Sequence, residues 1–195
     1  MCILTPEAVQ GPFYFDPKLV RADITEGRPR RAAGAHPAGG FRQGLHKAER
    51  RARVDLWHAD GRGMYSGYRG QGDDGISTRG ETFLRGTQLT GADGQVRFAT
   101  IYPGWYPGRT PHIHFKVLLD ATSLVTGQLY FPDDLSARIY AGVAPYNDRK
   151  AKRDIVANEE DFIFQDQGGA DTLVSVTEEG GSYLASLVIG VNRAG

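Results

Sequence analysis

The sequence has almost no cysteine and no excess charge of either sign. Its 195 residues contain a single cysteine, Cys2, which excludes an internal disulfide and a cysteine metal cluster. Lys and Arg together number 23, as do Asp and Glu, so the formal net charge is zero. Nucleic acids and anionic membrane surfaces are held chiefly by basic residues. The balanced charge therefore argues against either of them as a partner.

Long apolar runs are absent as well. No stretch of about 18 apolar residues is available to cross a membrane. The first ten residues, MCILTPEAVQ, lack the basic and then apolar pattern of a signal peptide. We therefore expect a cytoplasmic protein that makes no membrane contact. An exported ancestor is a second interpretation, which depends on residues 30–51.

Glycine and proline, in contrast, are abundant, with 26 and 10 residues. This composition favours many turns and short strands over long helices. Apolar residues make up 40% and charged residues 24% of the chain, which is ordinary for a globular protein. The length allows one domain with a proper core. No repeat of 20 to 50 residues is evident, so we expect a single domain over residues 1–195.

Alternating apolar and polar residues predict several short strands. They are carried by ARVDLWHAD (52–60), TFLRGTQLTGADGQVRFATIY (82–102), HIHFKVLL (112–119), GQLYF (127–131) and TLVSVTEEGGSYLASLVIGV (172–191). The second stretch contains two strands joined by a turn, and the last is a hairpin. Helix is predicted only within residues 133–158. The fold class is therefore mainly β: a β-sandwich with short polar helices and long loops.

Residues 30–51, RRAAGAHPAGGFRQGLHKAERR, depart from this pattern because they have no period of 2 or 3.6 residues. A core strand is expected here. One interpretation is a natural loop. The other is a shifted reading frame, because GC-rich codons for this segment allow a one-base shift that encodes an alternating apolar strand. That strand would carry a cysteine able to pair with Cys2 in an exported ancestor. We expect the segment to be irregular and the domain to be of low stability.

The stretch YPGWYPGRTPHIHFKV (102–117) holds two histidines on alternate positions of a predicted strand. His112 and His114 therefore point to the same side, roughly 7 Å apart at the backbone. Two imidazoles on one face can bind a single ion, whereas the plainer interpretation is a pair of hydrogen-bonded structural histidines. Tyr106 and Arg109 lie just upstream. A second turn rich in tyrosine, GMYSGY (63–68), follows another strand.

The residues near this pair favour ferric iron over zinc. No cysteine is available as a third ligand, and Asp120 lies six residues past His114. Zinc prefers His, Cys and carboxylate. Phenolate is a hard anionic donor, and the phenol of tyrosine gives up its proton only when the bound cation is strongly acidic. Fe(III) is the ion that best suits two phenolates together with two imidazoles.

The sequence resembles a known family, the intradiol ring-cleavage dioxygenases, which include protocatechuate 3,4-dioxygenase and catechol 1,2-dioxygenase. The motifs that carry the resemblance are LTPEAVQGPFYFDP, VDLWHADGRGMYSGY, TFLRGTQLTGADGQVRFATIYPGWYPGRTPHIHFKV and TGQLYF. They extend over residues 4–164 apart from 30–51. The resemblance implies a β-sandwich that holds one mononuclear non-haem Fe(III).

The resemblance also implies an activity in aromatic compound catabolism. A catechol-type ring would be cleaved by O2 between its two hydroxylated carbons, giving a cis,cis-muconate derivative. The implied partners are a small catecholic substrate and O2, and a homo-oligomer is a further expectation.

The resemblance assigns the iron ligands to Tyr65, Tyr106, His112 and His114. It implies that Tyr106 is the ligand that leaves iron and takes a proton from the substrate. Tyr68 is the alternative to Tyr65, but Tyr65 matches the family's Tyr-Ser pair. Tyr102 is the alternative to Tyr106, but it continues a strand and is interpreted as a packing residue. Trp57, Trp105 and His58 are also expected to be structural.

Other matching residues are implied to bind substrate or to assist catalysis. Arg109 would stabilise negative charge on the substrate as O2 attacks, and Gln128 lies on the strand after the ligand strand. Gly11, Pro12 and Phe13 match the loop that walls the substrate pocket. Only five residues separate Tyr106 from His112, where several members have a long insertion, so the preferred catechol stays open.

Two other functions remain alternatives. One is a cupin-like or other non-haem iron or zinc enzyme that uses His112, His114 and a carboxylate. The other is a non-catalytic β-sandwich binding module with a degenerate metal site.

Overall fold

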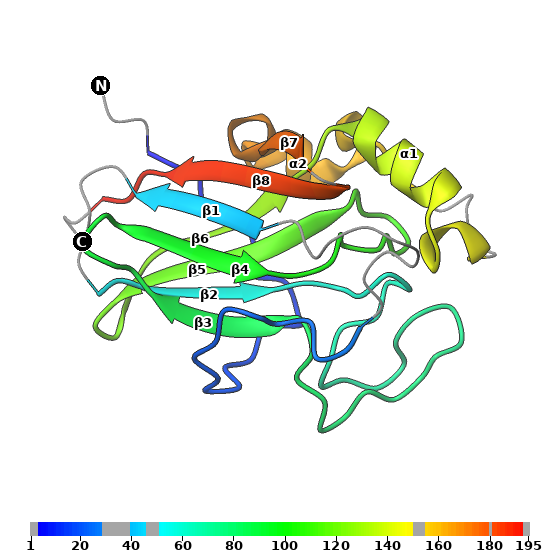
Figure 1. Cartoon of the computed structure of the whole chain (residues 1–195), viewed down its shortest axis with the longest axis horizontal. Coiled ribbons are helices and arrows are strands. Elements are labelled where there is room, and N and C mark those ends of the chain that lie inside the picture. Colours follow the sequence, from blue (N-terminus) through cyan, green and yellow to red (C-terminus); the bar gives the residue numbers. More distant parts are fainter. Residues whose placement is uncertain (1–3, 29–39, 46–50, 150–154, 180, 193–195) are drawn as a thin grey trace.

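The computed structural model describes residues 4–28, 40–45, 51–149, 155–179 and 181–192, which form two stacked four-stranded sheets (Figure 1). One sheet has the order β4-β1-β8-β7 and the other the order β3-β2-β5-β6. The strands are β1 (Gly40–Leu45), β2 (Arg53–Trp57), β3 (Arg85–Leu89), β4 (Gln95–Ala99), β5 (His112–Leu119), β6 (Thr122–Tyr130), β7 (Ser175–Glu179) and β8 (Ser182–Ile189).

The main core lies between the two sheets, because strands of both sheets turn apolar side chains inward. Ile113, Phe115 and Val117 of β5 are completely buried there. They belong to the same apolar cluster as Phe98 of β4 and Ile189 of β8. This packing confirms the predicted β-sandwich. It also places the alternate residues of β5, among them both histidines, on the outer face of their sheet.

The register of the second sheet aligns residues that the sequence keeps far apart. β5 pairs antiparallel with β2 and with β6. His114 is opposite Trp57 on one side and Gln128 on the other, and His112 is opposite Tyr130. Side chains directly opposite each other across an antiparallel pair lie on the same face. The outer face of this sheet therefore gathers two imidazoles, an indole, an amide and a phenol.

The expectation of an irregular segment at residues 30–51 is wrong for residues 40–45. These residues form β1, which pairs antiparallel with β4 and parallel with β8. A strand between two others finds partners for its N–H and C=O groups on both edges, and this pairing does not depend on an alternating side-chain pattern. Residues 29–39 and 46–50 lie outside the described residues.

Two other local predictions have mixed outcomes. The hairpin of β7 and β8 is confirmed by their antiparallel pairing. The strands on either side of the 92–94 turn are also present, but β3 and β4 belong to different sheets. This turn is therefore a connection between the two sheets.

Helical segments extend beyond the region where they were predicted. α1 (Asp133–Gly142) and the short 3₁₀ helix η1 (Tyr146–Asp148) lie within it. The prediction that helix stops at residue 158 is wrong. Three more pieces follow: η3 (Asn158–Glu160), α2 (Phe162–Asp166) and η4 (Gly169–Thr172). Asp161 starts α2 because its side chain accepts hydrogen bonds from two backbone N–H groups.

The N-terminal segment crosses β6 on its way to the outer face of the second sheet. The backbone N–H of Ala8 donates to the carbonyl of Thr126 at 2.9 Å. The Gln128 side chain donates to the carbonyl of Val9 at 3.0 Å. These contacts bring Gly11 close to the ring of His114 on β5. Among the described residues, no helix is both long and apolar enough to span a bilayer.

Candidate metal centre

His112 and His114 are both 2% exposed, and different contacts orient their rings. Nδ1 of His112 donates to the carbonyl of Thr110 at 2.7 Å. Because a carbonyl only accepts, the proton is on Nδ1 and Nε2 keeps a free lone pair. The ring of His114 stacks on Trp57 with 4.9 Å between centroids and 5° between planes. The two Nε2 atoms lie 3.2 Å apart.

Tyr65 enters this site from a firmly held turn. Its side chain is 1% exposed. The backbone N–H of Tyr65 donates to Gln71 Oε1 at 3.0 Å, and its carbonyl accepts from Thr78 Oγ1 at 2.7 Å. Next to it, the buried guanidinium of Arg85 donates to the Ser66 carbonyl at 2.8 Å. These contacts fix the backbone on both sides of the ring.

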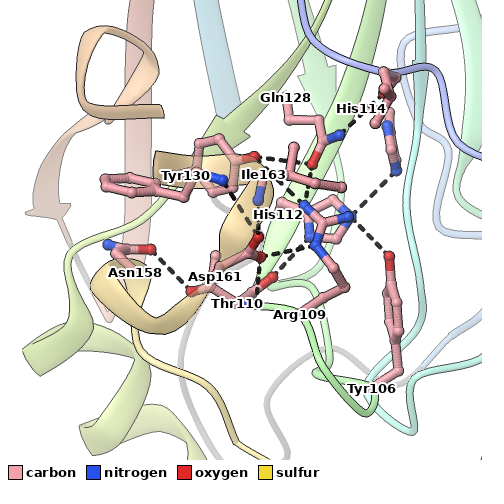
Figure 2. A network of polar contacts seen from close by, with 12 residues as sticks. Tyr106, Arg109, Thr110, His112, His114, Gln128, Tyr130, Asn158, Asp161 and Ile163 are labelled. Carbon is pink, nitrogen blue, oxygen red and sulfur yellow. Dashed lines mark hydrogen bonds and ion pairs between the residues drawn. The ribbon is translucent and has the colours of Figure 1, made fainter. Parts of the chain in front are cut away.

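Tyr106 enters from another segment, the loop before β5. Its backbone forms an isolated bridge with Arg109. Its neighbour Trp105 is buried, and the carbonyl of Trp105 accepts from Arg149. Tyr106 itself is partly exposed, as is the start of the turn that follows. Figure 2 shows its hydroxyl directed toward His112.

The four predicted ligand atoms converge. Tyr106 Oη is 2.9 Å from His112 Nε2, and Tyr65 Oη is 3.4 Å from the same nitrogen. The two phenol oxygens are 3.5 Å apart. Two neutral nitrogens and two oxygens that become anionic on metal binding suit Fe(III). The residues present therefore fit the ion that the sequence predicts.

Burial sets the protonation of this donor set. It depresses the pKa of His112 to about 3, and nearby Arg109 contributes to that shift. It likewise holds the pKa of His114 well below its usual value. Both imidazoles are therefore neutral and able to donate a lone pair at pH 7. Burial raises the pKa of Tyr65 well above its usual value and also raises that of Tyr106. Only a strongly charged cation would deprotonate these phenols.

The cupin-like alternative has no further ligand in the part of the chain that the structure describes. There, no three residues of the types His, Cys, Asp and Glu form a group that could hold a metal. His58, the buried histidine of a neighbouring strand end, is satisfied by the carbonyl of Ala59 at 2.8 Å and the hydroxyl of Thr100 at 2.7 Å. The nearest oxygen donors to His112 Nε2 are thus the phenols of Tyr65 and Tyr106.

Arg109 and Gln128 lie together beside the donor set (Figure 2). The Nη2 atom of Arg109 donates to Gln128 Oε1 and, at 3.4 Å, to Tyr130 Oη. Tyr130 Oη also donates to Gln128 Oε1 at 3.0 Å. The predicted arginine and glutamine therefore form one hydrogen-bonded unit at the edge of the site.

Sequence reasoning missed Asp161, which forms an ion pair with Arg109. Its side chain is fully buried, and Oδ2 lies 2.8 Å from Arg109 Nε. The two residues are 52 positions apart, so no local motif joins them. The available signal was an aspartate directly ahead of the apolar residues 162–164, which is the pattern of a helix N-cap.

The predicted pocket loop lies against two of the ligands. The ring of Phe13 stacks on Tyr65 with 4.6 Å between centroids. Gly11 has a φ of +71°, and a Cβ at this position would lie 3.3 Å from Cε1 of His114. Glycine therefore allows the loop to approach the imidazole closely. Pro12, between them, is exposed.

The alternative tyrosines have other partners. Tyr68 donates its hydroxyl to the carbonyl of Tyr14 at 3.1 Å. Tyr102 shares a hydrogen bond of 2.7 Å with Ser136 and packs on Phe131. Both are packing residues, so Tyr65 and Tyr106 are the tyrosines that meet the histidines.

Comparisons with known proteins agree with this geometry. A family model described as Dioxygenase matches residues 43–162. Catechol 1,2-dioxygenase 1 of Acinetobacter lwoffii is 28% identical over 151 residues, which are 67% of this chain and 47% of that protein. The protocatechuate 3,4-dioxygenase beta chain of Burkholderia cepacia is 39% identical over 98 residues, which are 45% of this chain and 40% of that one. The chain thus spans less than half the length of these curated relatives.

Among solved structures, an intradiol ring-cleavage dioxygenase from Tetranychus urticae is similar over the whole chain. Its TM-score is 0.85 at 29% sequence identity, and the match covers 100% of this chain and 97% of that one. The match therefore extends over both sheets. The chain belongs to the intradiol ring-cleavage dioxygenase family.

Proposed function

We propose that this protein is a ferric dioxygenase that cleaves a catechol between its two hydroxylated carbons. Both atoms of O2 would enter the product, a cis,cis-muconate derivative, so that one catechol and one O2 are consumed per turnover. The observation that carries the proposal is the convergence of four donor atoms, Tyr65 Oη, Tyr106 Oη and the Nε2 atoms of His112 and His114. Each of these atoms lies within 3.5 Å of at least one of the others.

Bound Fe(III), held by Tyr65, Tyr106, His112 and His114, would supply the Lewis acidity that draws electron density from a catecholate. The protein's own residues prepare the site for it. The two imidazoles are held neutral by burial, with Nε2 of His112 left unprotonated by the Thr110 contact. The two phenols supply the negative charge once their protons have left.

Tyr106 is the residue best placed to take a proton from the substrate at Oη. It is partly exposed, whereas Tyr65 is 1% exposed. A phenolate on the open side of the site can accept a hydroxyl proton and turn away without disturbing the core. Geometry that brings a base within hydrogen-bond reach of the proton is the first requirement of general-base catalysis.

Arg109 provides fixed positive charge beside the substrate space. Its guanidinium is held by Asp161 and Gln128 before any substrate arrives. A donor that is already oriented stabilises negative charge on the substrate without reorganising during the reaction. The ring of Phe13 stacks on that of Tyr65 and shields it from water.

Product analysis tests this proposal. The iron-loaded protein is incubated with catechol, protocatechuate or hydroxyquinol, and O2 uptake and products are measured. We expect a cis,cis-muconate derivative from at least one of the three and one O2 consumed per product. A 2-hydroxymuconic semialdehyde would indicate cleavage outside the two hydroxyls. Iron binding without turnover of any catechol would favour the non-catalytic binding module.

A further inference from the structure

The buried carboxylate of Asp161 accepts hydrogen bonds from four donors. Oδ2 accepts from Arg109 Nε at 2.8 Å and from the backbone N–H of Thr110 at 2.9 Å. Oδ1 accepts from the backbone N–H groups of Ile163 at 2.8 Å and Phe164 at 3.2 Å. Its side chain is 0% exposed. Both oxygens are therefore fixed, one on the loop before β5 and the other on the start of α2.

Thr110 connects this carboxylate to the imidazole of His112. Its N–H is bound by Asp161, while its carbonyl accepts from His112 Nδ1 at 2.7 Å. Its hydroxyl donates to Asn158 Oδ1 at 2.8 Å, and Asn158 in turn donates to the carbonyl of Phe131 at 2.8 Å. The peptide groups around Thr110 are thus held from both sides. The orientation of this carbonyl decides which nitrogen of His112 carries the proton.

The other branch runs from Asp161 through the guanidinium of Arg109 to Gln128 (Figure 2). Asp161 takes the Nε–H, which leaves the far side of the guanidinium to Gln128 and Tyr130. An arginine side chain has several rotatable bonds, and a charged partner that fixes its plane removes that freedom. The Asp161 carboxylate is therefore linked to Arg109 directly and to His112 through the backbone of Thr110.

We propose that Asp161 is a positioning residue that sets the orientation of Arg109 and the tautomer of His112 together. This inference rests on the proposed function. Asp161 touches neither the four donor atoms nor the substrate space; it acts through Arg109 and through the peptide of Thr110. Because α2 begins at the same carboxylate, the position of this short helix is coupled to both groups.

Two substitutions separate positioning from helix capping. Asp161→Asn is nearly isosteric and remains a good N-cap, but it loses the charge and one acceptor. Asp161→Ser keeps a capping oxygen for α2 and is too short to reach Arg109. Asp134→Asn is the matched control, because Asp134 also pairs with an arginine, Arg138 at 2.7 Å, but on the exposed side of α1. Circular dichroism confirms that each variant is folded.

Steady-state kinetics on the iron-loaded variants tests the Arg109 branch. Loss of a residue that orients an active-site group typically costs 10- to 100-fold in activity. We expect kcat to fall by about that factor in both Asp161 variants, with KM changed less than about threefold, and no change in Asp134→Asn. In an Arg109→Ala background, Asp161→Asn should lower kcat by less than about threefold, because Arg109 is gone and iron bound at Nε2 would itself keep the His112 proton on Nδ1. Independent, multiplicative losses would overturn this branch.

The His112 branch is tested in the metal-free protein, without any turnover. Imidazole ¹⁵N NMR of the wild type should show His112 with its proton on Nδ1. Both Asp161 variants should show a mixture of tautomers, while Asp134→Asn should match the wild type. An unchanged tautomer in both Asp161 variants would overturn the branch. If the wild type cleaves no catechol, the proposed function fails, yet this measurement still decides the role of Asp161.

Discussion

The turn that carries Tyr65 and the loop that carries Tyr106 differ in how firmly the chain holds them. The carbonyl and the N–H of Tyr65 are both bound by buried side chains, Thr78 and Gln71. The Tyr106 loop is bridged by its own backbone, and the residues that follow it are exposed. One of them, Gly108, has a φ of +80° and open space beside it. One tyrosine is therefore held within the protein and the other lies at its edge.

The difference in backbone contacts would suit Tyr65 and Tyr106 to different roles in one site. A ligand that must keep a metal in place benefits from a rigid backbone and full burial. A ligand that must accept a proton and move aside needs access to the substrate. Tyr65 has the first environment and Tyr106 the second, although their hydroxyls are only 3.5 Å apart.

The largest expected effect tests this contrast by removing each phenol oxygen in turn. Tyr65→Phe should weaken Fe(III) binding by about 100-fold or more, since even the loss of a residue that supports a ligand can cost that much. Tyr106→Phe should weaken binding less and abolish turnover, because the proton acceptor is gone. Competition with a chelator measures the affinities. Tyr68→Phe is the matched control and should leave both unchanged. Equal losses of affinity in the two ligand variants would remove the distinction.

The Arg109→Ala variant tests the loop of Tyr106 further, because Arg109 lies on the same loop. In the proposed function the guanidinium stabilises charge on the substrate and is not a donor to the metal, so Fe(III) should remain bound. Turnover should fall on the order of 100-fold, as is typical for the loss of one preorganised donor. Stopped assays with catechol and metal analysis give the two quantities. Near-normal turnover would show that the substrate does not use this arginine.

Thr78→Val tests the rigidity of the Tyr65 turn. Thr78 is 2% exposed, and its hydroxyl serves the Tyr65 carbonyl and the Tyr68 N–H. Valine leaves these backbone groups unpaired, which should lower the free energy of unfolding by about 2 kcal/mol. Gly108→Ala is the matching change in the other loop and should cost about 1 kcal/mol, from its positive φ alone. Urea denaturation compares them, and the opposite order would contradict the contrast.

The smallest effect concerns alkaline pH. Burial raises the pKa of both phenols above the usual value of 10.0, and it does so more strongly for Tyr65. The unfolded chain therefore releases these protons first, so stability is intact below pH 10 and is lost as the pH rises above it. Each such group contributes a slope of about 1.4 kcal/mol per pH unit.

Urea denaturation of the metal-free protein between pH 9 and 11 measures this slope. Below pH 10 the slope should be the same in all variants, whereas above pH 10 it should become shallower by one such contribution in Tyr65→Phe. In Tyr106→Phe the change should also begin at pH 10 but end at a lower pH than in Tyr65→Phe, because the folded-state pKa of Tyr106 is raised less. Identical curves for the two variants would contradict the difference in environment.

The four donor residues that meet in the structure could be named from the sequence because each lies in a short motif that resembles those of the family. His112 and His114 share a face by the alternation of a strand, and Tyr106 precedes them by a few residues. Asp161 could not be predicted, because it reaches Arg109 only after the chain has formed β6 and α1 in between. Local patterns specify faces and turns, whereas contacts across such separations depend on packing.

The two wrong predictions of secondary structure have the same origin. Residues 40–45 lack an alternating pattern, yet β4 and β8 provide hydrogen-bond partners on both sides of them. The backbone of a central strand is satisfied by its neighbours, which the sequence of that strand does not encode. Similarly, α2 is only five residues long and depends on its Asp161 cap. So short a helix is set by its tertiary contacts.

The central claim is that two inequivalent phenolates and two imidazoles hold one ferric ion. Visible absorption during titration of the metal-free protein with Fe(III) tests it most directly, because tyrosinate bound to Fe(III) gives a red-brown charge-transfer band. The account predicts a band that grows to one equivalent of iron and then stops. In Tyr65→Phe the band should be weaker and should need excess iron. A protein that stays colourless with iron bound would contradict the account.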